Sequence, residues 1–253
     1  MAKPLLRLGA VGLGDYAAFT DESSISGHRY MLVGGISCGS SHAQRVHDFV
    51  RRARLGSKYP TDSIQWKHYR DEKFDTYKRL IDFFVIEKEA QRIDFTCLVI
   101  NTRDLDHKRF NDGDGETFFQ KMMCQLYLRG IIGKYPRTSI VRGFHGHRVS
   151  RYDMAEVRSI INATAAKDSG DVIYRPLRQF EYKRVEDSGP HQLADVLLGA
   201  VSYYWNAGIQ RGGESRKRKL AEYVQSACCS VSLGRPTPPW MRNFDIWEFR
   251  LRD

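Results

Sequence analysis

The sequence predicts an α/β fold in which a mixed β-sheet is flanked by helices. Short apolar runs alternate along the chain with longer segments whose apolar residues recur three and four positions apart, the pattern of amphipathic helices. The first two apolar runs are joined by a turn, which predicts that the sheet begins with a hairpin. The 253 residues, 42% of them hydrophobic, suffice for one sizeable core, so we expect a single domain over residues 1–253 with a C-terminal extension at residues 209–253.

Two strands are predicted over residues 9–20 and 29–38, on either side of the turn DESSISGH. The second run, RYMLVGGISC, is nearly all apolar at its centre, so it belongs inside the sheet. Gly34 and Gly35 within it indicate a bulge or a close approach of another backbone. A helix over residues 41–55 follows, because Val46, Val50 and their neighbours repeat at helical spacing within a basic surface.

The rest of the chain continues the alternation. Further strands are predicted at residues 92–102, 138–149 and 171–185, with Pro176 favouring an edge or a break in the last one. Helical spacing of apolar residues or a suitable start and stop predicts helices at residues 71–90, 116–135, 152–170, 190–208 and 217–229. The tail, residues 235–253, is predicted to be irregular, with its aromatic side chains packed on the core.

The charge of the chain favours an acidic partner. Lysine and arginine number 40 against 30 aspartates and glutamates, a formal net charge of +10, and nucleic acid is the commonest partner of such a protein. The sequence contains no apolar run of about 18 residues, so we expect no membrane helix, and no signal peptide is recognisable. The five cysteines are scattered without a CxxC pair, which is typical of reduced thiols in a cytoplasmic protein.

Three carboxylates stand out as candidates for chemistry. Asp21 and Glu22 follow the predicted first strand, and Asp195 lies within the apolar segment LADVLLGAV. On a helix, Gln192, Asp195 and Gly199 share one face. A carboxylate in such surroundings needs a hydrogen-bond cluster, a cation or a metal ion as partner, and a salt-bridged Asp on the rim of the helix is the alternative.

Asp21 and Asp195 together would suffice to hold a divalent cation if folding brings them to one end of the sheet. Mg²⁺ prefers carboxylate oxygens and keeps several waters, and such an ion promotes hydrolysis of phosphodiesters. Lys67, in IQWKHY, could hold a phosphate as a point charge, or be an ordinary surface lysine. His145 and His147 lie two apart on a predicted strand, so they should point to one face and could bind metal or move a proton, or simply be packed.

Other common enzyme classes find no support in the sequence. A GxxxxGK[ST] phosphate loop and a GxSxG nucleophile elbow are absent. GAVGLG, at residues 9–14, partly matches a dinucleotide-binding fingerprint, but a second strand rather than a helix is expected to follow it.

Three segments taken together resemble a widespread prokaryotic family, the domain of unknown function 3800. They are TDES with the strand YMLVGGIS, IQWKHY before a long helix, and DSGPHQLADVLLGAVSYY, and the resemblance covers about residues 12–208. The QLAD helix with its upstream serine is the most specific part. The family is grouped with ribonuclease H-like folds, which implies a mixed sheet that starts with a hairpin and acidic residues of the first strand and a late helix meeting at one end.

The resemblance implies a role for each matching residue. Asp21 and Asp195 would be metal ligands, Lys67 matches the family lysine, and Ser188 and Gln192 match the polar residues that frame the helix. Glu22 should face away from Asp21 by strand alternation unless the strand has ended. The family glutamate two positions before the lysine is Gln65 here, and its later aspartate is replaced in the segment FHGH. These changes remove two negative charges, which lowers the expected affinity for Mg²⁺, and a histidine suits Mn²⁺, Zn²⁺ or a single-ion site better. The chain is then either a variant nuclease with Asp21, Asp195 and His147 as ligands of Mg²⁺ or Mn²⁺, or a degenerate fold kept for binding.

Two functions compete on these observations. The first is a metal-dependent nuclease acting on DNA or RNA, with Asp21, Glu22, Lys67, His147 and Asp195 as catalytic residues. The second is a catalytically degenerate module that binds nucleic acid or protein in a prokaryotic defence or mobile-element system, and a weaker third is a nucleotide-processing or toxin-like enzyme. In either leading case, phosphates would be bound by Arg45, Arg51, Arg52 and Lys67 and by the cluster SRKRK, and a protein partner or a second copy of the chain is a further candidate.

Overall fold

The computed structural model describes residues 14–24, 27–104, 114–148, 150, 153–206, 216–228 and 231–250. Six strands are present in this part of the chain: β1 (Asp15–Ser23), β2 (Tyr30–Gly39), β3 (Ile93–Asn101), β4 (Ile140–Gly146), β5 (Leu177–Lys183) and β6 (Phe244–Phe249). The α-helices are α1 (Ser40–Leu55), α2 (Phe74–Glu89), α4 (Gly115–Gln125), α5 (Met154–Ser169), α6 (Gly189–Trp205) and α7 (Arg218–Cys228). Some predicted positions lie outside the described residues: 9–13, 149, 152, 207–208, 229 and 251–253.

The six strands form one mixed sheet in the order β5-β4-β1-β2-β3-β6. The strands β1 and β2 form the predicted antiparallel hairpin, and β2 also pairs antiparallel with β3. The other pairings, β1 with β4, β4 with β5 and β3 with β6, are parallel. Since β2 alone runs against the rest, the carboxyl ends of β1, β4 and β5 lie side by side at one end of the sheet.

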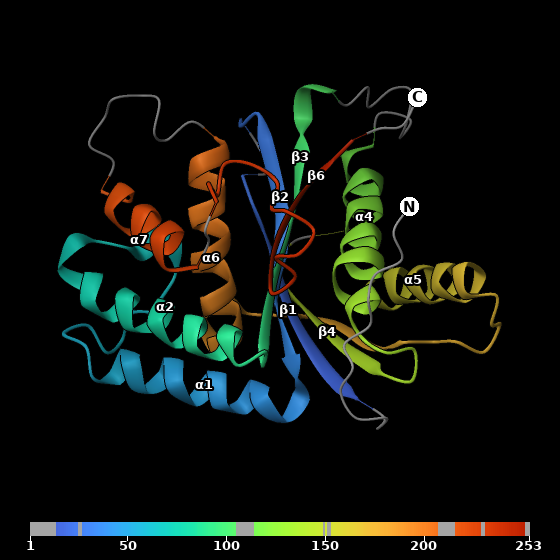
Figure 1. The fold of residues 1–253 in the computed structure, drawn as a ribbon, viewed down its shortest axis with the longest axis horizontal. Helices are drawn as coiled ribbons and strands as arrows, with labels where there is room; N and C mark the ends of the chain where they lie inside the picture. The colour runs from blue at the N-terminus through green and yellow to red at the C-terminus, as the bar shows by residue number, and fades with distance from the viewer. Residues whose placement is uncertain are drawn as a thin grey trace.

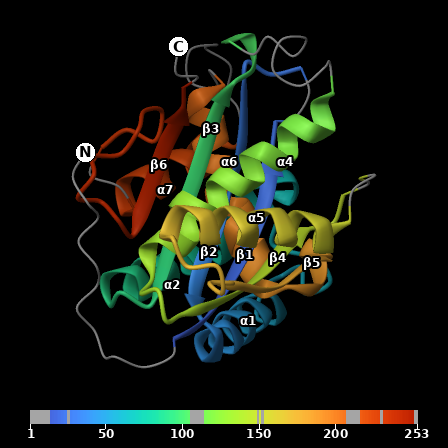
Figure 2. The ribbon, with the colours of Figure 1, turned by 90° about the vertical axis from the view of Figure 1, so that its right-hand side faces the viewer.

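Helices cover both faces of the sheet. The helices α1, α2, α6 and α7 lie on one face and α4 and α5 on the other (Figure 1), and α4 and α5 stand in front of the sheet when the molecule is turned (Figure 2). Each face has its own apolar core, built around residues such as Phe95 and Leu197 on the α6 side and Leu98 and Phe118 on the α4 side. The predicted α/β architecture with flanking helices is confirmed. None of the helices in the described part of the chain has the length and apolar character that a bilayer span requires.

The strand β1 shows how side chains are divided between the two cores. Ala17 and Phe19 belong to the core beneath α6, whereas Ala18 belongs to the core beneath α4. Successive side chains of a strand point to opposite faces, so Asp21 is directed to the α6 face and Glu22 to the α4 face. The strand runs on to Ser23, and the two acids lie inside it rather than after its end as predicted.

The structure corrects several other predicted boundaries. The helix predicted over residues 116–135 ends at Gln125 and continues as a π-helical segment, η4 (Leu126–Ile131), and a 3₁₀ turn. The last predicted strand region contains only β5, an edge strand that begins just after Pro176, in agreement with the edge position expected from that proline. The tail predicted as irregular contains β6, which pairs with β3 and places Phe244 in the core, while Trp240 is 79% exposed.

The glycine pair of β2 marks a close approach of neighbouring backbones. A Cβ at Gly35 would lie 2.0 Å from the carbonyl oxygen of Phe19, and one at Gly34 would lie 2.6 Å from that of Thr96. Both values are far below a van der Waals contact, so only glycine fits between the neighbouring strands β1 and β3 at these positions.

Candidate functional site

A pocket of about 640 Å³ lies at the carboxyl ends of the parallel strands β1, β4 and β5. Asp21 lies near the end of β1, and His147 and Arg184 directly follow β4 and β5. Asp195 on α6 and the segment of Gln65 and Lys67 complete its lining. The carboxyl ends of parallel strands are the usual place for ligand sites in α/β proteins. Four of the five predicted catalytic residues, Asp21, Lys67, His147 and Asp195, therefore line one pocket.

The carboxylate of Asp21 fits against a glycine of the neighbouring strand. A Cβ at Gly146 would lie 2.3 Å from Asp21 Oδ1, so the absence of a side chain there makes room for the carboxylate. The backbone N–H of Glu22 donates a hydrogen bond to the same oxygen at 2.9 Å. The pKa of Asp21 is raised to about 7, mainly by burial and also by the charges of Glu22 and Asp195, while His145 and the Glu22 N–H lower it. A cation in the pocket would relieve this penalty.

Asp195 lies on the face of α6 that holds the segment of residues 64–67. Gln192 Oε1 accepts a hydrogen bond from the Ile64 N–H at 2.8 Å, and one turn later Asp195 Oδ2 accepts one from the Trp66 N–H at 2.5 Å. A further turn along, the Trp66 ring lies directly on Gly199, where a Cβ would approach Cγ of the ring to 2.2 Å. The predicted shared face of Gln192, Asp195 and Gly199 is confirmed, and its role is to fix this segment across the helix.

The segment of residues 64–67 is held from its other side by α2. The Tyr77 hydroxyl donates a hydrogen bond of 2.6 Å to the Gln65 carbonyl, and the Gln65 side chain, itself buried, donates to Ser63 Oγ at 2.7 Å. Lys67 follows in a short 3₁₀ turn, η1 (Trp66–His68), rather than at the edge of a strand, and it is exposed to solvent. The clamped segment therefore presents the Lys67 ammonium at the pocket without burying it.

Basic groups surround Asp195. Burial raises the pKa of its carboxyl group, and the Trp66 N–H, Lys67, Lys217 and His68 lower it. Lys217 Nζ lies 5.5 Å from the centre of the Trp66 ring, and burial lowers the pKa of this lysine while the Asp195 charge raises it. The sequence pointed only to the SRKRK cluster as a whole. Lys217 reaches the site because α7 packs against α6, and no local sequence pattern predicts this tertiary contact.

Glu22, predicted as a catalytic residue, does not line this pocket. It lies on the opposite face of β1, where its carboxylate accepts a hydrogen bond of 2.6 Å from His145 Nε2, and Arg148 is 3.8 Å away. Nδ1 of the same imidazole lies 2.9 Å from Thr20 Oγ1. Thr20 and Glu22 flank Asp21, so His145 bridges the two neighbours of Asp21 and holds that stretch of β1 against β4.

The two histidines of FHGH have different surroundings. His145 is fully buried in β4, whereas His147 lies one residue beyond the strand, is exposed and lines the pocket. Both rings lie near Tyr182, with centroid distances of 6.1 Å and 5.9 Å, but His145 contacts Glu22 on the opposite face of β1 and only His147 lines the pocket. Only His147 is placed to exchange protons with a ligand in the pocket.

Ser188 and His191 stabilise the start of α6. His191 is buried, and burial lowers its pKa to about 3, so the ring is neutral. Its Nε2 lies 3.2 Å from the Phe144 carbonyl, which can only accept, so Nε2 carries the proton and Nδ1 accepts from the Ser188 hydroxyl at 2.8 Å. Ser188 therefore links α6 to β4 through His191 and does not cap the helix.

Asp21, Asp195 and His147, the predicted metal ligands, all line this pocket. Within the described residues, no group of three or more His, Cys, Asp or Glu side chains is arranged to hold a metal ion, so Asp21, Asp195 and His147 do not form a closed ligand set. Mg²⁺ is often held by one or two carboxylates, with waters and substrate phosphate as its other ligands. Asp21 and Asp195 fit such a partial set, and His147 would add a ligand acceptable to Mn²⁺.

The arginines predicted to bind nucleic acid divide between two sides of α1. Arg45 is 3.1 Å from Glu87, a buried carboxylate, and Arg52 is exposed. Arg51 instead lies on the side of α1 that faces α6, with His47 and Arg54. The arginines of α1 therefore lie on separate sides of the helix with different neighbours, and not on the single basic surface that the sequence suggested.

Comparisons with other proteins give no relative from which a function could be carried over. The chain matches none of the protein-family models searched, and no curated protein matches it.

Proposed function

We propose that this chain is a metal-dependent nuclease that hydrolyses phosphodiester bonds of DNA or RNA, with Asp21 and Asp195 as ligands of one Mg²⁺ or Mn²⁺ ion. The observation that carries the proposal is that carboxylates of β1 and α6, from distant parts of the chain, line one pocket with Lys67 and His147. We further propose that the domain is ribonuclease H-like. Its support is the mixed sheet that begins with a hairpin, with acids of the first strand and of a late helix at one end.

Each residue has a role that follows from its position. Asp21 and Asp195 supply hard oxygen ligands, and Lys67 binds a non-bridging oxygen of the phosphate as a point charge. His147, exposed at the rim, accepts or returns a proton at the reacting oxygens. A divalent ion, when bound, would activate water and neutralise charge that builds up on the phosphate.

A non-catalytic module that binds nucleic acid or protein in a defence or mobile-element system is the second candidate. Two observations favour it: Gln65 provides an amide where the resemblance implies a carboxylate, and Asp195 Oδ2 is already occupied by the Trp66 N–H. Both reduce the negative charge available to a cation. Such a module would keep the basic surface but would not hydrolyse phosphodiester bonds.

A cleavage assay separates the two candidates. Labelled single- and double-stranded DNA and RNA are incubated with Mg²⁺ or Mn²⁺ and the wild type, Asp21→Asn or Asp195→Asn. We expect cleavage to fall about 100-fold or more in both variants, because each removes a ligand worth several kcal/mol of transition-state stabilisation. Asp168→Asn, at an exposed carboxylate on α5, is the matched control and should cut like the wild type. Salt-sensitive binding without cleavage under either ion would favour the module.

Moving the Asp21 carboxylate without removing it gives a second prediction. In Gly146→Ala the new Cβ occupies the space of Asp21 Oδ1, so the carboxylate must rotate out of place. We expect cleavage to fall about tenfold or more, since small displacements of catalytic groups are costly, with a smaller effect on the melting temperature. Gly39→Ala is the control, because no atom lies within 4 Å of a Cβ there. Equal activity of both variants would show that the position of Asp21 does not matter.

A further inference from the structure

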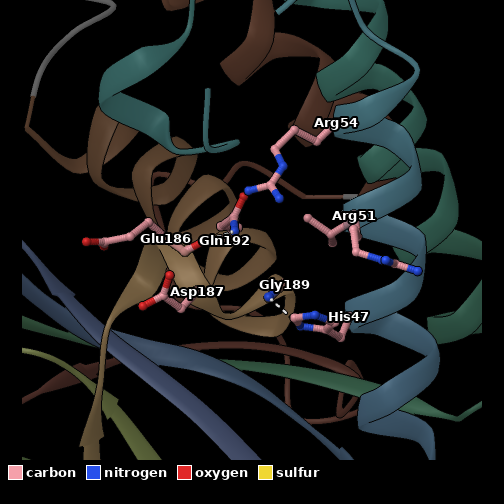
Figure 3. A pocket seen from close by; sticks show the side chains of 8 residues that line it. His47, Arg51, Arg54, Glu186, Asp187, Gly189 and Gln192 are labelled. Carbon is pink, nitrogen blue, oxygen red and sulfur yellow. Dashed lines mark hydrogen bonds between the residues drawn. The ribbon is translucent and has the colours of Figure 1, made fainter. Parts of the chain in front are cut away.

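A second cavity, of about 210 Å³, lies between α1 and the start of α6. His47, Arg51 and Arg54 of α1 line it at spacings of four and three residues, so they occupy one side of the helix. Gly189 and Gln192 of α6 line the opposite wall (Figure 3). A water occupies about 30 Å³ of the liquid, so the cavity has room for several waters or for one phosphate group.

Arg54 is the central residue of this cavity. Figure 3 shows its guanidinium reaching across the cavity towards Gln192, while Arg51 extends along the outer side of α1. Among the described residues no hydrogen-bond partner reaches Arg54 Nε, although this atom is buried. A buried donor without an acceptor is uncommon and unfavourable, and an oxyanion in the cavity would supply the acceptor.

The acids near the cavity do not neutralise Arg54. Glu186 and Asp187 also line it, but Arg184 lies 2.6 Å from Glu186 and 3.8 Å from Asp187. Figure 3 shows both carboxylates pointing away from Arg51 and Arg54. Arg54 therefore remains available to an anion in the cavity.

The start of α6 contributes electrostatically to the cavity. The helix has 17 residues and no acid in its first turn, so its N-terminus carries a positive partial charge at the cavity wall. The Gly189 N–H donates to His47 Nδ1 at 3.3 Å, which leaves Nε2 of this imidazole with the proton and makes it a donor. His47 and Arg54 are thus two kinds of donor suited to a phosphate oxygen, and the helix start adds its positive partial charge.

The cavity adjoins the pocket of Asp21 and Asp195. Glu186 lines both, and α6 contributes Gly189 to the cavity and Asp195 to the pocket. Six residues of a helix span about 9 Å, and one nucleotide advances a strand by about 3.4 Å along a duplex axis. Phosphates two or three nucleotides apart on one strand can thus reach the two sites together.

We propose that the cavity of His47, Arg51 and Arg54 is a phosphate-binding subsite for a polynucleotide whose scissile phosphate lies at Asp21 and Asp195. This inference rests on the proposed nuclease function and adds a requirement: the substrate is a strand of several nucleotides, held by a phosphate away from the one that is cut. A free phosphate ion has the same chemistry but lacks the second attachment, so it should bind much more weakly.

The test compares Arg54→Gln with Arg79→Gln, a matched loss of one charge at an exposed position of α2. Binding of a labelled oligonucleotide is measured against salt concentration with Ca²⁺ in place of Mg²⁺, and cleavage is measured on the oligonucleotide and on a small diester with a single phosphate. We expect Arg54→Gln to weaken oligonucleotide binding about tenfold and to lower the salt slope by about one, and Arg79→Gln to change affinity less than about twofold. Hydrolysis of the small diester should be the same in all three proteins.

The outcomes distinguish a failure of the proposed subsite from a failure of the proposed nuclease function. Equal binding losses in Arg54→Gln and Arg79→Gln would overturn the subsite, even if the wild type cleaves nucleic acid. Loss of small-diester hydrolysis in Arg54→Gln, with an unchanged melting temperature, would overturn it too, because the residue would then act at the reaction centre. Competition by inorganic phosphate as strong as by the oligonucleotide would assign the cavity to a free anion. Absence of metal-dependent cleavage in the wild type, with the Arg54 binding loss intact, would refute the nuclease and leave the phosphate site.

Discussion

Replacing Asp21 by asparagine should make the metal-free protein more stable at pH 8 by about 3 kcal/mol, while near pH 4 the two proteins should be equally stable. Burial raises the pKa of this carboxyl group from 3.8 to about 7. Each unit of difference between the folded and the unfolded state corresponds to about 1.4 kcal/mol, which sets an upper limit of about 4 kcal/mol. Asparagine keeps the hydrogen bond from the Glu22 N–H and carries no charge to desolvate.

The direction with pH follows from proton uptake. Between about pH 4 and pH 7 the folded protein binds the Asp21 proton and the unfolded chain does not, so the free energy of unfolding of the wild type falls as pH rises through this interval. The free energy of unfolding of Asp21→Asn should not show this decrease. Urea unfolding of both proteins from pH 4 to pH 8, in the presence of a chelator, measures the difference directly.

Asp15→Asn provides a control of opposite sign. The hydrogen bonds that Arg142 donates to Asp15 lower the pKa of Asp15, so its charged form stabilises the fold and its removal should destabilise the protein at pH 8. If Asp21→Asn were also less stable than the wild type at pH 8, the buried carboxylate would not be the unfavourable group that the geometry indicates. Mn²⁺ should raise the stability of the wild type at pH 8 and leave Asp21→Asn nearly unchanged, since a ligand stabilises the state that binds it.

Such a stability cost is a common property of functional sites, where groups are held in surroundings that disfavour them in the absence of a ligand. Asp21 and Asp195 are both carboxyl groups whose pKa is raised by burial at the same pocket. By contrast, Glu87 is buried among His42, Arg45 and Arg92, and hydrogen bonds and charges from these partners lower its pKa. The partners of Asp21 and Asp195 do not offset the effect of burial on the pKa of these groups, whereas the partners of Glu87 do. This difference is why we propose a function for the pocket and a structural role for Glu87.

The sequence allowed prediction of those features that depend on local periodicity. The alternation of strands and helices, the first hairpin and the shared face of Gln192, Asp195 and Gly199 follow from spacing alone. The strand β6 could not be predicted with the same ease, because its tail contains Pro238 and Pro239 and its pairing with β3 is non-local. The end of β1 was placed too early because Asp and Glu are rare in strands, although a sheet end with a ligand site tolerates them.

The residues of the candidate site also divide into those that the local sequence predicts and those that depend on contacts between distant segments. Asp21, Lys67, His147 and Asp195 could be selected by residue type and context, and the structure brings them to one pocket. Lys217, Gly146 and the backbone N–H of Trp66 could not, because their roles arise from contacts between segments far apart in the chain. The sequence alone could not show which arginines of α1 face α6, because tertiary packing determines which side of the helix lies against α6.

The contact between Gly199 and Trp66 should control both stability and activity, and a double-mutant cycle can show it. In Gly199→Ala the new Cβ would approach Cγ of the Trp66 ring to 2.2 Å, so the ring must move and take the Trp66 N–H away from Asp195. Overpacking of this kind costs about 1–3 kcal/mol, and the better helix propensity of alanine returns up to about 1 kcal/mol. We therefore expect Gly199→Ala to destabilise the protein by about 1–2 kcal/mol and to impair cleavage, because Lys67 moves with the same segment.

In the Trp66→Ala background the same substitution should change sign. With the ring removed, the Cβ that Gly199→Ala introduces meets no obstacle from position 66, and only the helix propensity remains, so the substitution should stabilise the protein by about 0.5–1 kcal/mol. Urea unfolding of the four proteins then gives a coupling energy of about 1.5–3 kcal/mol between the two positions. Additive effects would mean that the ring does not rest on α6. In that case the hydrogen bond from the Trp66 N–H would not by itself keep Asp195 and Lys67 at the pocket. The hydrogen bonds of Tyr77 and Gln192 would then be the contacts that hold residues 64–67 in place.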